Sequence, residues 1–277
     1  MAVDGRTHVI PHLAYPSAHV RTPQLMNSRF ADLGLNALVV PWEVSPEGLG
    51  HTLAAFKHAG SLPGMIVTIP HKEAVAASCD EMQGVAEVLQ VANVIRKADD
   101  GRFIGALFDG KGFVCGLQKT GFRIETARTL VLGAGGAATA IAHALLEAGV
   151  DDLVIANRSV ERAQKLVQLL FALFPLKQIA AGPADGTGFD LVVNATSVGL
   201  DGDPRIPLDV STLTADQCVA DIIMKPVLTP LLAGAQARGA TIHYGEPMLL
   251  EQVDLFIDFL LGPGTVDCAL RQHKSGE

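Results

Sequence analysis

The sequence has little of what marks several specialised classes of protein. Its 277 residues hold four cysteines, Cys79, Cys115, Cys218 and Cys268, and no C-x-x-C pair, so neither a zinc knuckle nor a dithiol redox motif is indicated. No apolar run reaches the roughly 18 residues of a membrane-spanning helix, and residues 1–30 contain no uninterrupted apolar segment of a secretory signal. A reducing cytoplasm, without membrane association, is the expected setting.

Positive charge is also scarce. The 21 Lys and Arg residues stand against 29 Asp and Glu, and they are scattered rather than gathered into a stripe, so no nucleic-acid partner is expected. Hydrophobic residues make up 49% and charged residues 18%, which favours a globule with a sizeable core. No internal repeat is visible, and the tail after Pro263 is the one segment expected to be disordered.

Short apolar runs alternate with longer helical patterns, which is typical of an α/β protein with a parallel sheet. In the first part of the chain, this pattern predicts a helix over 46–59 and strands over 37–41, 64–68, 92–97 and 103–106, the last two forming a hairpin across Asp99-Asp100-Gly101.

A sharper series begins at residue 129. It predicts strands over 129–132, 152–156, 191–194, 218–223 and 240–243, and helices over 136–148, 160–173 and 247–261. The expected architecture has two domains: a substrate-binding and catalytic α/β domain over 1–108, to which 246–277 return, and a Rossmann-like, doubly wound dinucleotide-binding domain over 109–245.

The strongest motif is a glycine-rich turn between the strand 129–132 and the helix that follows. Gly133-Ala134-Gly135-Gly136-Ala137-Ala138 fits G-x-G-x-x-A, in which the glycines allow a tight turn and a close approach to a pyrophosphate at the helix N-terminus. A strand-to-helix turn without a ligand is the alternative interpretation.

The tip of the next strand bears on the choice between NADP and NAD. It reads Ala156-Asn157-Arg158-Ser159 and lacks the carboxylate that binds an unmodified ribose. Arg158, with Arg162 one helical turn later, offers guanidinium groups for a 2′-phosphate. NADP is therefore favoured, although NAD stays open because Arg158 could simply cover a solvated loop.

Taken together, these motifs resemble the shikimate/quinate dehydrogenase family from about Pro16 to Gly262. The first half carries Val67-Thr68-Ile69-Pro70-His71-Lys72, Asn93 and the segment Gly105 to Phe113. The second half carries the turn at Gly133 to Ala137, Asn157-Arg158-Ser159 with Arg162, Asn194-Ala195-Thr196-Ser197 with Gly199, Asp221 with Pro226, Thr229-Pro230, and Gly245 with Met248 and Gln252.

The resemblance implies hydride transfer between a nicotinamide and a secondary alcohol of a cyclic hydroxy acid, with Lys72 as acid/base and Asp109 as its orienting partner. It implies substrate contacts at Thr22, Arg21, Thr68, Asn93 and Gln252. It also implies cofactor contacts at Gly133, Ala134, Gly135, Gly136, Ala137, Asn157, Arg158, Ser159, Arg162, Thr196, Ser197, Ile222, Gly245 and Met248. His71 is left out of the catalytic set, because a lone histidine is usually structural.

Several positions depart from the family pattern. Where shikimate-specific members have two serines that bind the substrate carboxylate, this chain has Val20-Arg21-Thr22, which keeps one hydroxyl. Ile66, Leu107, Phe108 and Met224 also replace polar residues, which predicts a more apolar pocket and moves the expected substrate from shikimate toward quinate or a related hydroxy acid.

Three functions are compatible with these residues: an NADP-dependent oxidoreductase of quinate, shikimate or an analogue, a dinucleotide-binding sensor with vestigial catalysis, and a Rossmann enzyme of folate-like or tRNA-linked carbonyls, which fits Asp221 to Gln252 less well. No metal site is expected. The expected partner is a small hydroxy acid, and a homodimer stays a possible assembly.

Overall fold

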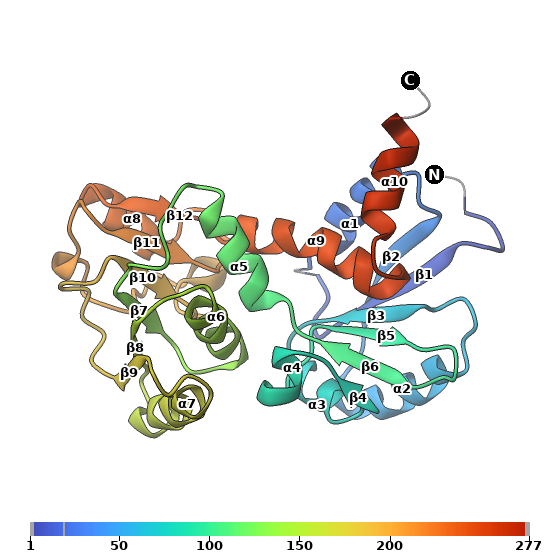
Figure 1. Cartoon of the computed structure of the whole chain (residues 1–277), viewed down its shortest axis with the longest axis horizontal. Helices are drawn as coiled ribbons and strands as arrows, with labels where there is room; N and C mark the ends of the chain where they lie inside the picture. Colours follow the sequence, from blue (N-terminus) through green and yellow to red (C-terminus); the bar gives the residue numbers. More distant parts are fainter. Residues whose placement is uncertain (1–2, 19, 275–277) are drawn as a thin grey trace. The chain divides into compact units, whose positions relative to one another are not determined.

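The computed structural model describes residues 3–18 and 20–274, and for residues 272–274 only the backbone. The chain divides into two compact units: residues 1–108 together with 252–277, and residues 109–251 (Figure 1). The first unit is therefore discontinuous in sequence, whereas the second is a single stretch.

The first unit is an α/β unit built on a six-stranded sheet. Its strands lie in the order β2-β1-β3-β5-β6-β4, with the pairs β1–β2, β1–β3 and β4–β6 parallel and the pairs β3–β5 and β5–β6 antiparallel. The elements are β1 (His8–Ala14), α1 (Thr22–Asp32), β2 (Ala37–Glu43), the 3₁₀ turn η1 (Pro46–Gly48), α2 (Leu49–Lys57), β3 (Gly64–Val67), α3 (Lys72–Ala76), β4 (Glu81–Met82), α4 (Val85–Leu89), β5 (Val94–Lys97), β6 (Phe103–Ala106) and α10 (Thr265–Lys274).

The β5–β6 hairpin was predicted from the local sequence, whereas the strand β1 was not. The β5–β6 hairpin is confirmed, and Gly101 in its turn has φ 83°, a conformation that favours glycine. The strand β1 was missed because it contains Pro11. Val9 donates to the carbonyl of Ser61 on the β3 side, so Pro11 faces that side as well, just before pairing with β3 begins at His12.

The second unit is a parallel sheet of the doubly wound type. Its strands lie in the order β12-β11-β10-β7-β8-β9, so the chain reverses direction across the sheet between β7 and β10. The elements are α5 (Asp109–Gln118), β7 (Thr129–Leu132), α6 (Gly136–Glu147), β8 (Asp152–Ala156), α7 (Val160–Leu173), β9 (Gln178–Ala181), β10 (Leu191–Asn194), the 3₁₀ turns η2 (Leu200–Gly202) and η3 (Val210–Thr212), β11 (Cys218–Asp221), α8 (Pro230–Ala237), β12 (Thr241–His243) and the start of α9 (Glu246–Leu261), which belongs to the first unit from Gln252 onward. The predicted α/β fold class is confirmed.

The chain returns to the first unit later than the sequence predicts. The sequence predicts that the chain rejoins the first unit at residue 246, whereas in the structure it does so at Gln252, within α9. The physical reason is packing: Met248 belongs to the second unit's apolar core, and a β-carbon on Gly116 of α5 would lie 3.0 Å from Pro247. The first turns of α9 are therefore held by the second unit.

The prediction of a disordered tail after Pro263 is wrong up to residue 274, and residues 275–277 lie outside the described residues. Residues 265–274 form α10, and Val266 and Ala269 are buried in the first unit's core with Phe30 and Phe256. Gly262-Pro263-Gly264 interrupts the helical pattern without ending the ordered chain.

Candidate dinucleotide site and catalytic segments

The glycine-rich turn is built for a close approach of backbone groups. Gly133 has φ 120°, and a β-carbon on it would lie 2.9 Å from the carbonyl oxygen of Ala195, so a side chain there is excluded both by conformation and by space. Gly135 is the N-cap residue of α6 and provides no side-chain cap. The first amides of α6 are therefore available to an anion.

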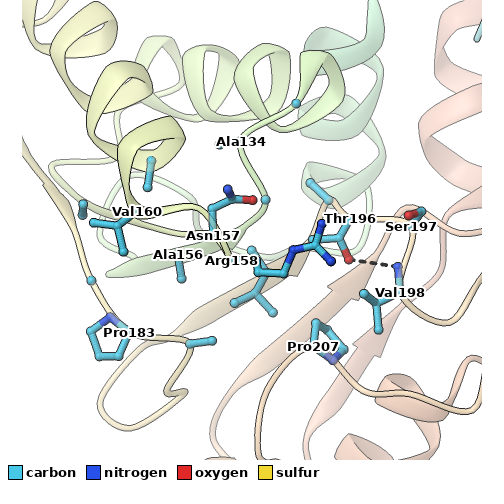
Figure 2. Close-up of a pocket in the computed structure, with 18 of the residues that line it drawn as sticks. Ala134, Ala156, Asn157, Arg158, Val160, Pro183, Thr196, Ser197, Val198 and Pro207 are labelled. Carbon is cyan, nitrogen blue, oxygen red and sulfur yellow. Dashed lines mark hydrogen bonds between the residues drawn. The ribbon is translucent and has the colours of Figure 1, made fainter. Parts of the chain in front are cut away.

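A cavity of about 810 Å³ opens beside this turn (Figure 2). Seven of the predicted cofactor residues line it: Gly133, Ala134, Gly135, Asn157, Arg158, Thr196 and Ser197. Seven others do not: Gly136, Ala137, Ser159, Arg162, Ile222, Gly245 and Met248. The sequence analysis missed Gln164, Ala181 to Ala184, Arg205 and Pro207, which also line the cavity.

The tip of β8 supplies one wall. Ser159 is the N-cap of α7: its hydroxyl accepts the amide of Arg162 at 3.4 Å and donates to the Glu161 carboxylate at 2.8 Å. The bond to Glu161 is the main reason that the pKa of Glu161 is lowered. Ser159 therefore orders the turn that carries Arg158, and in Figure 2 the Arg158 side chain extends toward Thr196.

A buried polar network supports the opposite wall. The Asn194 side chain donates to Asp221 at 3.1 Å and accepts from the amide and the hydroxyl of Thr196 at 3.0 and 2.7 Å. Asp221 also accepts the Thr229 hydroxyl at 2.7 Å and the amide of Ile223 at 3.0 Å. Burial raises the pKa of Asp221 even though these three hydrogen bonds oppose the shift.

Three further predicted cofactor residues, Met248, Ile222 and Gly245, are closely packed in the second unit. Met248 is 9% exposed within the apolar core, and Ile222 packs against the same core. Gly245 leaves no room for a side chain, because a β-carbon there would lie 2.5 Å from the Ile222 carbonyl oxygen. That these three residues contact a cofactor stays a prediction.

In the first unit, the predicted catalytic lysine follows β3. Lys72 is the first residue of α3, its side chain is half-buried, and its carbonyl accepts the amide of Ala92 at 3.1 Å. His71 is 1% exposed, and its Nε2 lies 2.7 Å from the Val44 carbonyl oxygen. This contact supports the structural interpretation of His71.

Two predicted substrate residues bind each other. The Asn93 amide donates to Gln252 Oε1 at 2.8 Å and accepts the amide of Phe108 at 3.0 Å, and both side chains are buried. Thr68 follows β3 and is half-buried. Arg21 is the N-cap residue of α1, and Thr22, the first residue of the helix, is buried. Asp109 opens α5 in the second unit and is buried.

The expectation of a more apolar substrate pocket stays a prediction, and the structure shows where three of the replaced residues pack. Ile66 is 2% exposed and packs in the first unit's core with Val94 and Ala106. Leu107 is 4% exposed, and Phe108 packs against the rings of Phe256 and Phe259. The side chains of Ile66, Leu107 and Phe108 therefore contribute to packing in the first unit.

The reversal of strand order between β7 and β10, the glycine turn and the cavity beside it define a dinucleotide-binding protein of the Rossmann class. Two family models match the chain: a shikimate dehydrogenase substrate binding domain over residues 13–95, and shikimate / quinate 5-dehydrogenase over residues 116–198. The chain belongs to the shikimate/quinate dehydrogenase family of oxidoreductases, as the sequence resemblance predicted.

Individual relatives are similar over most of the chain. A shikimate dehydrogenase (NADP(+)) of Rubrobacter xylanophilus is 36% identical over 257 residues, 90% of this chain and 89% of the relative. The structure of shikimate 5-dehydrogenase from Thermus thermophilus in complex with NADP(H) and shikimate has TM-score 0.84 and 30% identity, over 95% of this chain and 98% of its own.

A third relative differs in its named activity. The ligand-free 5-ketofructose reductase of Gluconobacter sp. strain CHM43 has TM-score 0.84 and 30% identity, over 97% of this chain and 99% of its own. All three relatives are named as enzymes, so the alternative of a sensor with vestigial catalysis receives no support.

None of the helices formed by residues 3–18 and 20–274 combines the length and the apolar character that a membrane crossing requires.

Proposed function

We propose that this chain is an NADP-dependent dehydrogenase that acts on a secondary alcohol of quinate, shikimate or a close analogue. The observation that carries the cofactor proposal is the cavity at the carboxyl ends of β7 and β8. It combines the glycine turn, the uncapped amides of α6 and Arg158, and no carboxylate is among its described lining residues. The NADP of the Rubrobacter and Thermus relatives is consistent with this pocket.

The residues fit a dinucleotide. Gly133 allows the backbone to approach a pyrophosphate, and the α6 amides supply donors to it. Arg158 supplies positive charge at the tip of β8. When bound, NADP⁺ supplies the acceptor for the hydride that leaves the alcohol carbon.

The chain itself must remove the hydroxyl proton. As the alcohol C–H electron pair leaves as hydride and the carbonyl forms, the O–H proton passes to the neutral amine of Lys72. In the reverse direction the Lys72 ammonium returns that proton. The carboxylate of Asp109 is proposed to orient the Lys72 amine. Thr22, Arg21, Thr68, Asn93 and Gln252 are proposed to contact the substrate.

Reduction of an uncharged polyhydroxy ketone is a second candidate. It is favoured by Val20, which supplies no side-chain donor where shikimate-specific members of the family bind the substrate carboxylate. The similarity to 5-ketofructose reductase points the same way.

The deciding experiment is absorbance at the reduced nicotinamide band with purified protein. Shikimate and quinate are each offered with NADP⁺ and with NAD⁺, and 5-ketofructose is offered with NADPH as a further arm. We expect turnover of a cyclic hydroxy acid with NADP⁺. Turnover of the ketose alone would favour the second candidate, and silence in every arm would contradict both.

We propose a cytoplasmic setting, because the sequence has only four cysteines, far apart and without a C-x-x-C pair. A homodimer is the assembly to test, and light scattering on the purified chain decides it.

A further inference from the structure

Two arginines line the cavity, and they come from different elements. Arg158 stands at the tip of β8, and Arg205 stands in the loop between η2 and η3. They are the only charged residues among the described residues that line it. Arg162, which the sequence analysis paired with Arg158, is exposed on α7 and does not line the cavity.

The Arg205 guanidinium is held in place by its own loop. Its Nε lies 2.9 and 3.0 Å from the two carboxylate oxygens of Asp203, and its Nη2 lies 2.7 Å from Oδ2. Asp203 also accepts the Arg205 amide at 3.1 Å. These contacts lower the pKa of Asp203 to about 2, so the carboxylate is charged throughout the neutral range.

This ion pair leaves part of the guanidinium available. A guanidinium has five N–H donors, and Asp203 uses the Nε donor and one on Nη2, so three donors remain on the far edge. The side chain is 72% exposed, whereas that of Asp203 is 20% exposed. A guanidinium ordered by a carboxylate on one edge loses less conformational freedom when its other edge binds a ligand.

Ion pairs between an Asp and the Arg two residues later also occur elsewhere in the chain. Asp4 binds Arg6 at 3.0 Å, and Asp100 binds Arg102 at 2.8 Å, each across one intervening residue. Neither Arg6 nor Arg102 lines the cavity. An ion pair between an Asp and the Arg two residues later thus forms readily in several loops. At 203–205 this pair places a guanidinium on the cavity wall.

We propose that Arg205 is the second guanidinium that recognises the 2′-phosphate of NADP, and that Asp203 positions it. This inference rests on the proposed cofactor. Two guanidiniums, with no carboxylate among the described residues that line the cavity, suit a phosphate dianion, whose oxygens accept several charge-assisted hydrogen bonds. An unmodified ribose offers no such charge, so Arg205 contributes to selectivity for NADP over NAD.

The test uses two fragments that differ only in this phosphate. Binding of 2′,5′-ADP and of 5′-ADP to the full chain is measured by calorimetry for the wild type and for Arg205→Ala. We expect the dissociation constant of 2′,5′-ADP to rise about 10-fold to 100-fold, which is the loss typical of a charged hydrogen bond. The dissociation constant of 5′-ADP should change less than about 3-fold by the same reasoning.

Two further variants make the result specific. Arg102→Ala removes the Arg102–Asp100 ion pair of the β5–β6 hairpin and should leave both dissociation constants unchanged. Arg162→Ala tests the competing assignment. A selective loss in Arg162→Ala but not in Arg205→Ala overturns the inference, as does an equal loss for both fragments in Arg205→Ala, which would indicate stacking on adenine.

The two proposals fail in different ways. If the wild type binds 2′,5′-ADP and Arg205→Ala binds it equally well, the role of Arg205 is refuted and the proposed cofactor stands. If the wild type binds 5′-ADP but not 2′,5′-ADP, both the NADP proposal and the role of Arg205 are refuted.

Discussion

At the scale of single residues, one buried histidine holds the backbone on which the proposed catalytic lysine stands. His71 is bound through its ring to the carbonyl of Val44, and its amide donates to the carbonyl of Thr68 at 3.0 Å. Lys72 follows directly, with its carbonyl held by Ala92. The backbone of Lys72 is thus fixed on both sides, as a group that must meet a reacting hydroxyl requires.

Lys72→Ala is expected to lower kcat by about 10²-fold to 10⁴-fold, because it removes the group that accepts the hydroxyl proton. The dissociation constant of NADP⁺ should be little changed, since Lys72 does not line the dinucleotide cavity. Steady-state kinetics and cofactor titration check this. Lys57→Ala, at a partly exposed ion pair in the same unit, is the control, and an equal loss of kcat there would contradict the assignment.

Arg158→Ala is expected to raise the KM for NADP⁺ at least about 10-fold while the KM for NAD⁺ changes much less, because a guanidinium–phosphate contact exists only with NADP. The two KM values are measured with the same alcohol at saturating concentration. Equal increases would show that Arg158 contacts the part common to both dinucleotides.

At the scale of elements, the loop after β10 is tied to two other segments through one network. Asn194 joins the amide and hydroxyl of Thr196 to Asp221 at the end of β11, and Asp221 binds Thr229, the N-cap of α8. The cavity wall at Thr196 therefore depends on side chains that do not themselves line the cavity.

Asp221→Asn is expected to lower the free energy of unfolding by about 1–3 kcal/mol, because an amide cannot accept all three of the hydrogen bonds that reach Asp221. Urea unfolding measures this loss. The exchanged pair Asn194→Asp with Asp221→Asn should regain part of it, since a carboxylate at 194 still accepts from Thr196. An exchanged pair less stable than either single variant would contradict the network.

The helices and strands of the second unit were easier to predict from the sequence than those of the first, for physical reasons. Its buried strands are short apolar runs, and each tight turn is marked by glycine or asparagine, so β7, β8, β10 and α7 match their predicted bounds. By contrast, β1 in the first unit carries Pro11 and was missed. In the second unit itself β9 was missed too, because it is an edge strand with three exposed residues out of four and lacks the pattern of a buried strand.

The cavity was predictable only where a local motif reports it. Gly133 and Arg158 stand in recognisable turns, whereas Arg205 and Pro207 reach the cavity through an irregular loop that no periodicity marks. The burial of Ile66 in the first unit's core was not predictable either, because it depends on tertiary contacts with Val94 and Ala106.

At the scale of the whole molecule, two histidines of the second unit are buried. His143 lies on α6, and His243 ends β12 with its ring 6.0 Å from that of Phe113. Within the described residues, Nε2 of His243 has no hydrogen-bond partner. Burial lowers the pKa of both histidines, so the folded state favours their neutral forms.

Stability should therefore fall in mild acid. Below the usual histidine pKa of about 6.5, these histidines are protonated in the unfolded chain but stay neutral in the folded chain. The free energy of unfolding therefore decreases as pH falls toward the lowered pKa of the folded state. Between pH 7.5 and 5.5, the free energy of unfolding of His243→Leu should fall by about 1 kcal/mol less than that of the wild type. The exposed His51→Gln should behave like wild type, and identical pH profiles for all three would contradict this role.

Urea unfolding should be followed by circular dichroism. Trp42, the single tryptophan, lies in the first unit and would not report on the second.

The discontinuity of the first unit has a consequence for the order of events during synthesis. The ribosome releases residues 109–251 as a complete unit while the first unit still lacks Phe256, Ile257 and Leu260 of its core. Because domains fold as units, the half that is made later can fold earlier, and the amino-terminal strands must wait for the last helices of the chain. During that interval the nascent first half leaves exposed the apolar residues that those helices later cover.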